Sequence, residues 1–506
     1  MVHAESVNQG GEFIILDTDD MNGRWSPFRN WISLAGLVLA AASLFSFVLL
    51  FVIDSMAKEP SPYQGLLTFV VAPGFFVAGC GLMLLGWFFQ RRYQIKHAAG
   101  APPPFLSIDL SRPQDRRCLF WFAFSAVIFL LVAAVGSYHS YHYVESVAFC
   151  GQLCHKPMHP EYTTYIKSPH ARVSCTECHV GPGAASFVKA KLNGVHQLYA
   201  TLTDSFDRPI KTPLHAMREA KYTCENCHWP QKYIGNKEKT YVRYLSDETN
   251  TVVATRMLLK VGGGDPAHGP VGGIHWHMNL NNKVEYLATD DRRQEIPWVR
   301  LTNAKGEVTE YRAAGFTNEV NTAQVRVMDC IDCHNRPAHQ YSSPGNAVDL
   351  SLRTGRLDPN LAGIKMNAVE ALSAEYTTQA EARDKIAEFL KSKYPQEAKL
   401  SSMVAEVQQI YAQNIFPEMK ASWKAYPDNI GHKEWPGCFR CHDGRHKTAD
   451  GKQKIEASNC NDCHVILAQA AGKEASAFDP QGLTFSHPDP SDDGTGANCN
   501  TCHGTE

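Results

Sequence analysis

The spacing of the cysteines constrains this chain more than any other feature of its sequence. Of 16 cysteines in 506 residues, all but Cys80 and Cys118 belong to seven short motifs that each end in a histidine. Six motifs are Cys-x-x-Cys-His, and the first has three residues between its cysteines. The motif cysteines are Cys150, Cys154, Cys175, Cys178, Cys224, Cys227, Cys330, Cys333, Cys438, Cys441, Cys460, Cys463, Cys499 and Cys502. The histidines are His155, His179, His228, His334, His442, His464 and His503.

Covalent haem attachment requires this spacing, because two thiols one short turn apart can each bond a vinyl group while the next histidine faces the iron. A single Cys-x-x-Cys could also be a zinc half-site, a redox dithiol or a disulfide. Neither zinc nor disulfide chemistry requires a histidine after every second cysteine. The pattern therefore predicts seven covalently bound haem c groups, with the seven motif histidines as proximal iron ligands.

The second axial ligand decides whether a haem carries electrons or binds a substrate, because a six-coordinate iron has no open position. The sequence offers as many candidates as there are regular motifs: His170, His339, either His275 or His277, His432, His446 and His487. Each one alone could equally be a surface histidine. At the first motif, either a histidine or the thioether of Met158, three residues after His155, could bind the iron.

Three uncharged apolar segments occupy the first part of the chain. Residues 32–53, 66–89 and 118–137 are each long enough to cross a bilayer as a helix. The alternative, a buried core helix, would have to occur three times in close succession. Cys80 and Cys118 lie in or beside these segments, where small apolar packing accounts for them. The segments therefore predict a three-helix transmembrane region.

Basic residues predict the orientation of these helices. The 90–117 loop carries six of them, whereas residues 54–65 carry only Lys58. The positive-inside rule places that loop and residues 1–31 on the cytoplasmic side of a bacterial inner membrane. Residues after 137 then lie in the periplasm, where c-type haem is attached. Residues 1–31 do not resemble a cleavable signal, so the first segment is expected to be an uncleaved anchor.

The expected fold is mainly α with irregular loops, because haem groups fill much of the interior of a periplasmic multihaem cytochrome c domain, with little sheet. Alternating apolar residues and glycine turns predict a small strand-containing insertion at 229–329. Helical periodicity marks 364–430. The expected divisions are a cytoplasmic segment at 1–31, the transmembrane region at 32–137, a four-haem region at 138–345, and a helical segment with a three-haem region at 346–506.

Residues from about 118 to 340 resemble the NapC/NirT/NrfH family of membrane-anchored multihaem cytochromes. The likeness rests on an apolar span followed by Phe149-Cys-Gly-Gln-Leu-Cys-His-Lys-Pro-Met, by Tyr165-Ile-Lys-Ser-Pro-His, and by Cys330-Ile-Asp-Cys-His-Asn-Arg-Pro-Ala-His. Proteins of this family oxidise membrane quinol and pass the electrons to periplasmic partners. The resemblance implies that Met158 binds the first haem iron and that His339 binds the second.

The quinol site departs from the family pattern in two respects. The first motif has one extra residue between its cysteines and another before Met158. The family also places a lysine and then an acidic residue beside the first haem; Lys189 and Lys191 fit the lysine, but His196 replaces the acid. These three residues form the predicted quinol site, where His196 could accept a proton or bind iron. Lysines that snorkel at a membrane surface are the alternative.

Three membrane segments and three further haems make the chain similar to seven-haem inner-membrane cytochromes of the ImcH type. This resemblance implies oxidation of menaquinol and electron transfer to periplasmic multihaem cytochromes, toward anaerobic or extracellular metal respiration. A nitrite or hydroxylamine reductase, or the anchor subunit of one, is the alternative, although no lysine-bearing haem motif is present. With 49 basic and 51 acidic residues and no polyanion-binding signature, nucleic acid is not an expected partner.

Overall fold

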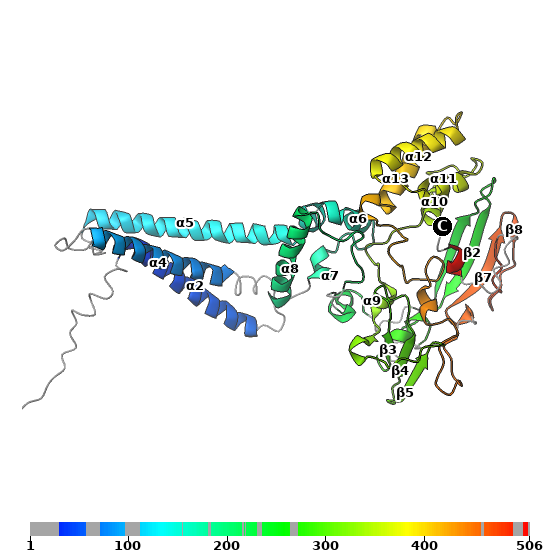
Figure 1. Ribbon diagram of the computed structural model, residues 1–506, viewed down its shortest axis with the longest axis horizontal. Coiled ribbons are helices and arrows are strands. Elements are labelled where there is room, and N and C mark those ends of the chain that lie inside the picture. The colour runs from blue at the N-terminus through cyan, green and yellow to red at the C-terminus, as the bar shows by residue number, and fades with distance from the viewer. Residues whose placement is uncertain are drawn as a thin grey trace, which may run out of the picture. The chain divides into compact units, whose positions relative to one another are not determined.

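The computed structural model (Figure 1) describes residues 30–56, 71–96, 112–153, 155–180, 184–214, 217, 219–229, 235–263, 272–456, 460–488 and 499–503. The chain divides into two compact units. One comprises Met1–Tyr141 and Pro182–Asn193, and the other comprises His142–Gly181 and Gly194–Glu506.

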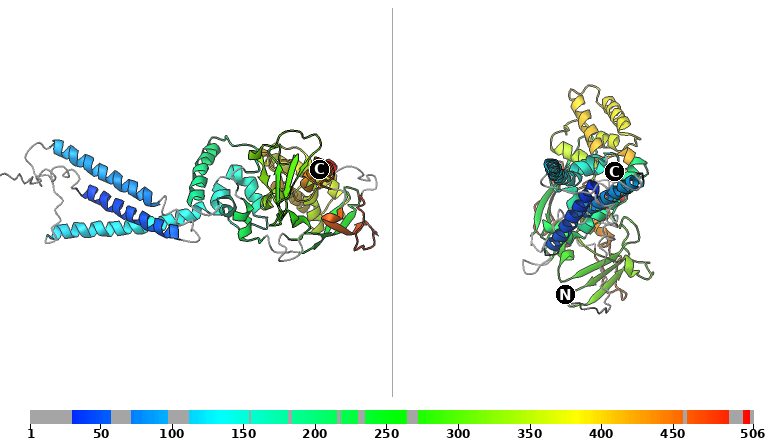
Figure 2. Two further views of the ribbon diagram at one scale, coloured as in Figure 1. Left: turned by 90° about the horizontal axis from the view of Figure 1, so that it is seen from below. Right: turned by 90° about the vertical axis from the view of Figure 1, so that its left-hand side faces the viewer.

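Two helices of the first unit are long and apolar enough to cross a membrane. They are α2 (Trp31–Met56) and α4 (Ala72–Lys96), which lie side by side (Figure 1, Figure 2). Glycines allow their close approach, because a Cβ added to Gly36 would lie 2.6 Å from the carbonyl oxygen of Gly79. Such small-residue contacts replace hydrophobic association where the surroundings are lipid. The first two predicted membrane segments therefore fall on helices of the expected kind, with residues 66–70 outside the described ones.

The third predicted segment also forms a helix. Helix α5 (Pro113–Val144) contains all of residues 118–137. Its aromatic side chains Phe120 and Trp121 are 62% and 61% exposed, which is unusual for large apolar groups unless lipid or protein covers them. The helical secondary structure agrees with the sequence, and the membrane crossing of α5 stays a prediction.

The haem motifs of the second unit lie on short helical turns. The α-helical ones are α6 (His155–Tyr165), which starts at the first motif histidine, α7 (Cys175–His179), α9 (Cys330–Cys333) and α14 (Cys499–His503). Tighter or wider single turns carry cysteines of the first, third, fifth and sixth motifs. They are, in that order, Phe149–Leu153, Cys224–Asn226, Gly437–Arg440 and Cys460–Asp462. Helix α8 (Ala184–Leu202) follows the second motif and spans the division between the two units.

Two antiparallel four-stranded sheets lie in the second unit (Figure 1). The strands predicted within 229–329 are confirmed as β1 (Lys237–Tyr244), β2 (Val252–Leu259), β3 (Lys283–Leu287), β4 (Trp298–Thr302), β5 (Val308–Arg312) and β6 (Arg326–Val327). The sheet content exceeds the expectation, because β7 (His464–Ala471) and β8 (Glu474–Ala475) complete the order β1-β2-β7-β8. Strand β7 begins at His464, which pairs with Leu259.

Four consecutive helices build an ordinary side-chain core. They are α10 (Pro344–Arg353), α11 (Ile364–Ser373), α12 (Gln379–Lys393) and α13 (Leu400–Asn414). Val348, Ile364, Ile386, Leu390 and Val407 are each 0% exposed in this core. The predicted helical periodicity is therefore confirmed over most of 364–430. This part of the chain needs no haem to fill its interior.

Candidate functional site

Five motif histidines each face a second histidine from elsewhere in the chain. The ring centres are 6.2 Å apart for His179 and His339, 6.0 Å for His228 and His170, 5.7 Å for His442 and His277, 6.3 Å for His464 and His432, and 6.2 Å for His503 and His487. In each pair, therefore, tertiary folding brings a sequence-predicted second ligand to a motif histidine.

These separations fit one metal ion between the two rings. A metal–nitrogen bond of about 2 Å and a ring centre about 1 Å beyond the nitrogen place two opposed imidazoles roughly 6 Å apart. Rings in direct contact can have the same spacing, so the hydrogen bonds of the rings provide the second test.

The Nδ1 atoms of four paired histidines hydrogen-bond to backbone carbonyls. His170 donates to Pro337 at 3.1 Å and His277 to Ile274 at 2.9 Å. His339 donates to Glu161 at 3.0 Å and His442 to Glu456 at 3.2 Å. Because a carbonyl only accepts, Nδ1 carries the proton and Nε2 keeps its lone pair. Histidines that bind metals are oriented in this way.

One short turn carries a histidine near the fourth motif and another near the fifth. The turn Ile274–Met278 carries His275 and His277. Burial lowers the pKa of His275, and the neighbouring His334 lowers it further. Met278 Sδ lies 3.9 Å from Cys330 Sγ, which also places this turn against the fourth motif. The sequence left His275 and His277 as alternatives, whereas the structure sets each beside a different motif histidine.

His446, one of the predicted axial ligands, lies between two hydrogen-bonding oxygens. Its Nδ1 lies 2.9 Å from Asp443 Oδ1, and its Nε2 lies 2.6 Å from the carbonyl oxygen of Ile296. Both ring nitrogens therefore lie within hydrogen-bonding distance of an oxygen atom. The side chain is 1% exposed. These contacts account for His446 as a buried hydrogen-bonding residue, and the Asp-x-x-His spacing is a weak sequence signal for them. Its role as an axial ligand stays a prediction.

Part of the first motif and of the predicted quinol site lies outside the described residues. This holds for Cys154, for the side chain of His155, and for those of Lys189 and Lys191. The side chain of Cys460, in the sixth motif, also lies outside them. Met158 lies on α6, and His196 is exposed on α8. The quinol site and the ligands of the first haem stay predictions.

Among the first five motifs, the described thiols of each motif lie near thiols of the next motif along the chain. A hydrogen bond from Cys150 lowers the pKa of Cys175 to about 7. Burial and then Cys224 raise the pKa of Cys178, and the same causes raise the pKa of Cys330 to about 11. Burial raises the pKa of Cys333 to about 11, with Cys438 among its neighbours. Each motif therefore lies close enough to the next for their side chains to interact.

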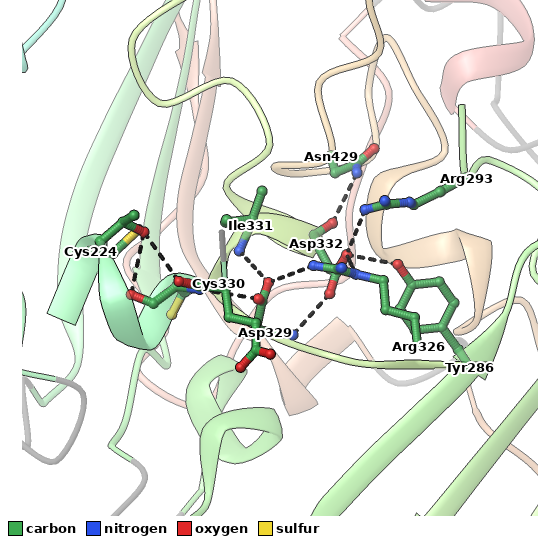
Figure 3. Close-up of polar contacts among 12 residues, drawn as sticks. Cys224, Tyr286, Arg293, Arg326, Asp329, Cys330, Ile331, Asp332 and Asn429 are labelled. Carbon is green, nitrogen blue, oxygen red and sulfur yellow. Dashed lines mark hydrogen bonds and ion pairs between the residues drawn. The ribbon is translucent and has the colours of Figure 1, made fainter. Parts of the chain in front are cut away.

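Asp332, which stands between the two cysteines of the fourth motif, is the centre of a buried polar network (Figure 3). Its Oδ1 accepts hydrogen bonds from Tyr286 at 2.7 Å and Arg326 at 2.8 Å, and lies 3.4 Å from Arg293. Its Oδ2 accepts from the backbone N–H of Asp329, which closes a capping box at the start of α9. The sequence gives no sign of this network, because only tertiary folding brings Tyr286 to the motif.

The backbone of Asp332 joins the fourth motif to the fifth. Its carbonyl accepts hydrogen bonds from Asn429 and from Arg440, both at 2.9 Å. Arg440 lies between Cys438 and Cys441. On the other side, Asp329 Oδ2 accepts from the backbone N–H of Ala220 at 3.3 Å, just before the third motif. Residues around α9 therefore hold three consecutive motifs in fixed relative positions.

Apolar helices, repeated haem motifs and opposed histidines together define a membrane-anchored multihaem c-type cytochrome. Residues 112–222 match the N-terminal region of the NapC/NirT cytochrome c family. Over 495 residues the chain is 39% identical to the cytochrome c-type protein ImcH of Geobacter sulfurreducens, and the match covers 95% of each chain. The chain therefore belongs to the same cytochrome c family as ImcH and carries a NapC/NirT cytochrome c domain. No solved structure matches it.

Family membership confirms the resemblance seen in the sequence and establishes a membrane cytochrome that binds haem c covalently and transfers electrons. It leaves the number of haem groups, the electron donor and the acceptor as matters for proposal.

Proposed function

We propose that this protein oxidises a membrane quinol, of the menaquinol type, and relays the electrons through seven haem c groups to a periplasmic multihaem cytochrome. Haem c, when bound, supplies reversible one-electron transfer at its iron. The protein would lie in the bacterial inner membrane with three spans and its motif-bearing region in the periplasm. Family membership and the two apolar helices α2 and α4 support this location.

The observation that carries the proposal is the set of opposed histidines. With the motif histidines on one side, the second axial ligands of the second to seventh haems would be, in motif order, His339, His170, His275, His277, His432 and His487. A histidine on each side of the iron leaves no open position for a substrate. This arrangement favours a relay over a nitrite or hydroxylamine reductase.

The chain would also accept the protons that the quinol releases and pass them to solvent. Oxidation of one quinol releases two electrons and two protons, so the site needs a base and a route to water. His196 is exposed on α8 and has the side chain that most often acts as a general base, so it would accept a proton and release it to solvent. Lys189 and Lys191 would hydrogen-bond the quinol oxygens, and Met158 would bind the first haem iron.

Reduction by quinol tests this proposal. The purified full-length protein in detergent is mixed with a reduced menaquinol analogue, and haem reduction is followed by absorbance. Rapid reduction is expected, with a rate at least tenfold lower in Lys189→Ala or Lys191→Ala. The exposed loop variant Lys305→Ala is the matched control and should keep the full rate.

Each result bears on a separate part of the proposal. Failure of quinol to reduce protein that dithionite reduces fully would refute the relay. Unchanged rates in both lysine variants would refute the assigned site. Several high-spin haems that bind nitrite would favour the reductase instead.

A further inference from the structure

We propose that Glu161 is a positioning residue for the second haem, which fixes the ring of His339 and lowers the midpoint potential of that haem through its buried carboxylate. The inference rests on the proposed function, because it takes His339 as the axial ligand opposite His179. The family likeness gave Glu161 no role, and sequence spacing alone does not connect it to His339.

Two oxygen atoms of Glu161 lie close to the same nitrogen of His339. The backbone carbonyl oxygen accepts a hydrogen bond from His339 Nδ1 at 3.0 Å, and the carboxylate Oε2 lies 3.1 Å from that nitrogen. Both oxygens only accept, so Nδ1 is protonated. The other nitrogen, Nε2, therefore keeps the lone pair that iron requires, in a ring whose centre is 6.2 Å from that of His179.

The carboxylate is held rigidly in a buried place. The Glu161 side chain is 12% exposed. Its Oε1 accepts a hydrogen bond from the Tyr341 hydroxyl at 3.1 Å and lies 3.5 Å from an Arg336 terminal nitrogen. Oε2 is buried and has no hydrogen bond within the part of the chain that the structure describes. The ring of His339 is thus the polar group that this oxygen faces.

Arg336 holds the same assembly from the other side. Its Nε donates to the carbonyl oxygen of His339 at 2.8 Å, and its guanidinium lies over the ring of Tyr426 at 4.3 Å. This cation balances part of the carboxylate charge, but it contacts Oε1, whereas Oε2 faces the ligand. His339 is therefore clamped through both its backbone and its ring.

A carboxylate next to a ligand histidine has a definite effect on redox equilibrium. It makes the imidazole more basic, and a buried negative charge interacts strongly because little water screens it. Both effects stabilise the oxidised, more positive form of the iron relative to the reduced form. Loss of this charge should therefore raise the midpoint potential of the second haem.

The position of Glu161 also links the first two haem sites. Helix α6 begins at His155, the first motif histidine, and Glu161 lies on the same helix less than two turns later. One short helix thus carries an expected ligand of the first haem and the group that orients a ligand of the second. A change of Glu161 acts at the step where electrons would leave the first haem.

The test compares Glu161→Gln with Glu177→Gln. Glu177 is exposed and lies between the two cysteines of the second motif, so its substitution removes the same charge near the same haem without touching His339. Full-length protein with complete haem content is titrated by spectroelectrochemistry, and the oxidised low-spin haems are recorded by electron paramagnetic resonance. Glu161→Gln should move one component to higher potential and change the g values of one low-spin haem. Glu177→Gln should leave both unchanged.

Three outcomes would overturn the proposal: no shift in Glu161→Gln, a shift of equal size in both variants, or a shift to lower potential. If Glu161→Gln fails to assemble, Glu161→Asp is measured instead; it keeps the charge but draws it away from the ring, so one component should again move upward. His339→Ala separates this inference from the ligand assignment. If no high-spin haem appears in His339→Ala, His339 is not an axial ligand. If a high-spin haem does appear in His339→Ala but the Glu161 variant shows no shift in potential, only the role of Glu161 is refuted.

Discussion

Substitution of Asp332 by alanine should loosen the loop between the two cysteines of the fourth motif. The side chain is 2% exposed and contacts Arg326, 30% exposed, and Arg293, 23% exposed, as well as the buried Tyr286 hydroxyl. Asp332→Ala leaves two guanidinium groups and one hydroxyl without this acceptor. The turn Cys330–Cys333 then loses its capping box.

The expected effect is about 3 kcal/mol. Removal of one partner from a fully buried ion pair costs about 3–5 kcal/mol, and partial exposure of both arginines reduces this because water recovers some of their solvation. The orphaned Tyr286 hydroxyl adds about 1 kcal/mol. A loss of about 3 kcal/mol corresponds to a roughly 100-fold increase in the population of the locally opened loop.

Amide hydrogen exchange measures this opening directly and does not require two-state unfolding of the whole chain. Exchange at residues 326–334 should rise roughly 100-fold in Asp332→Ala. Asp462→Ala is the matched control, because Asp462 holds the same place in the sixth motif but is exposed. An increase of less than about fivefold in Asp332→Ala, or equal increases in the two loops, would refute the reasoning.

Three further predictions follow from described contacts. His277→Ala should convert one low-spin haem to high-spin in the absorbance spectrum, and His446→Ala should not; the opposite pattern would favour His446 over His277 as an axial ligand. Burial raises the pKa of Glu285, but two basic neighbours bring it below 4.5, so its stabilisation is present above pH 4.5 and lost as pH falls through the lowered value. The melting temperature, measured from pH 6 to pH 3, should therefore fall less steeply toward acid pH in Glu285→Gln than in the unmodified protein. Gly79→Leu should lower the detergent stability of the paired helices, whereas Gly81→Leu, which meets open space, should not.

Local patterns accounted for much of the fold. Apolar runs predicted helices α2, α4 and α5 because the hydropathy of a segment depends only on its own residues. Alternation predicted strands within 229–329, and helical periodicity predicted the core over α11 to α13. The sequence did not indicate that β7 and β8, which follow the sixth motif, would extend the sheet of β1 and β2. Strand pairing across so long a separation depends on the tertiary fold.

By itself, the sequence determined where haem can be attached, because the two cysteines and the histidine of each motif must lie on one short turn. It also determined the supply of histidines from which second axial ligands could come. Only the tertiary structure decided where those histidines lie: His275 and His277 lie near the histidines of different motifs, His446 lies between Asp443 and Ile296, and Glu161 faces His339. Each pair of opposed histidines joins separate segments of the chain, so its members are brought together by folding and not by motif spacing.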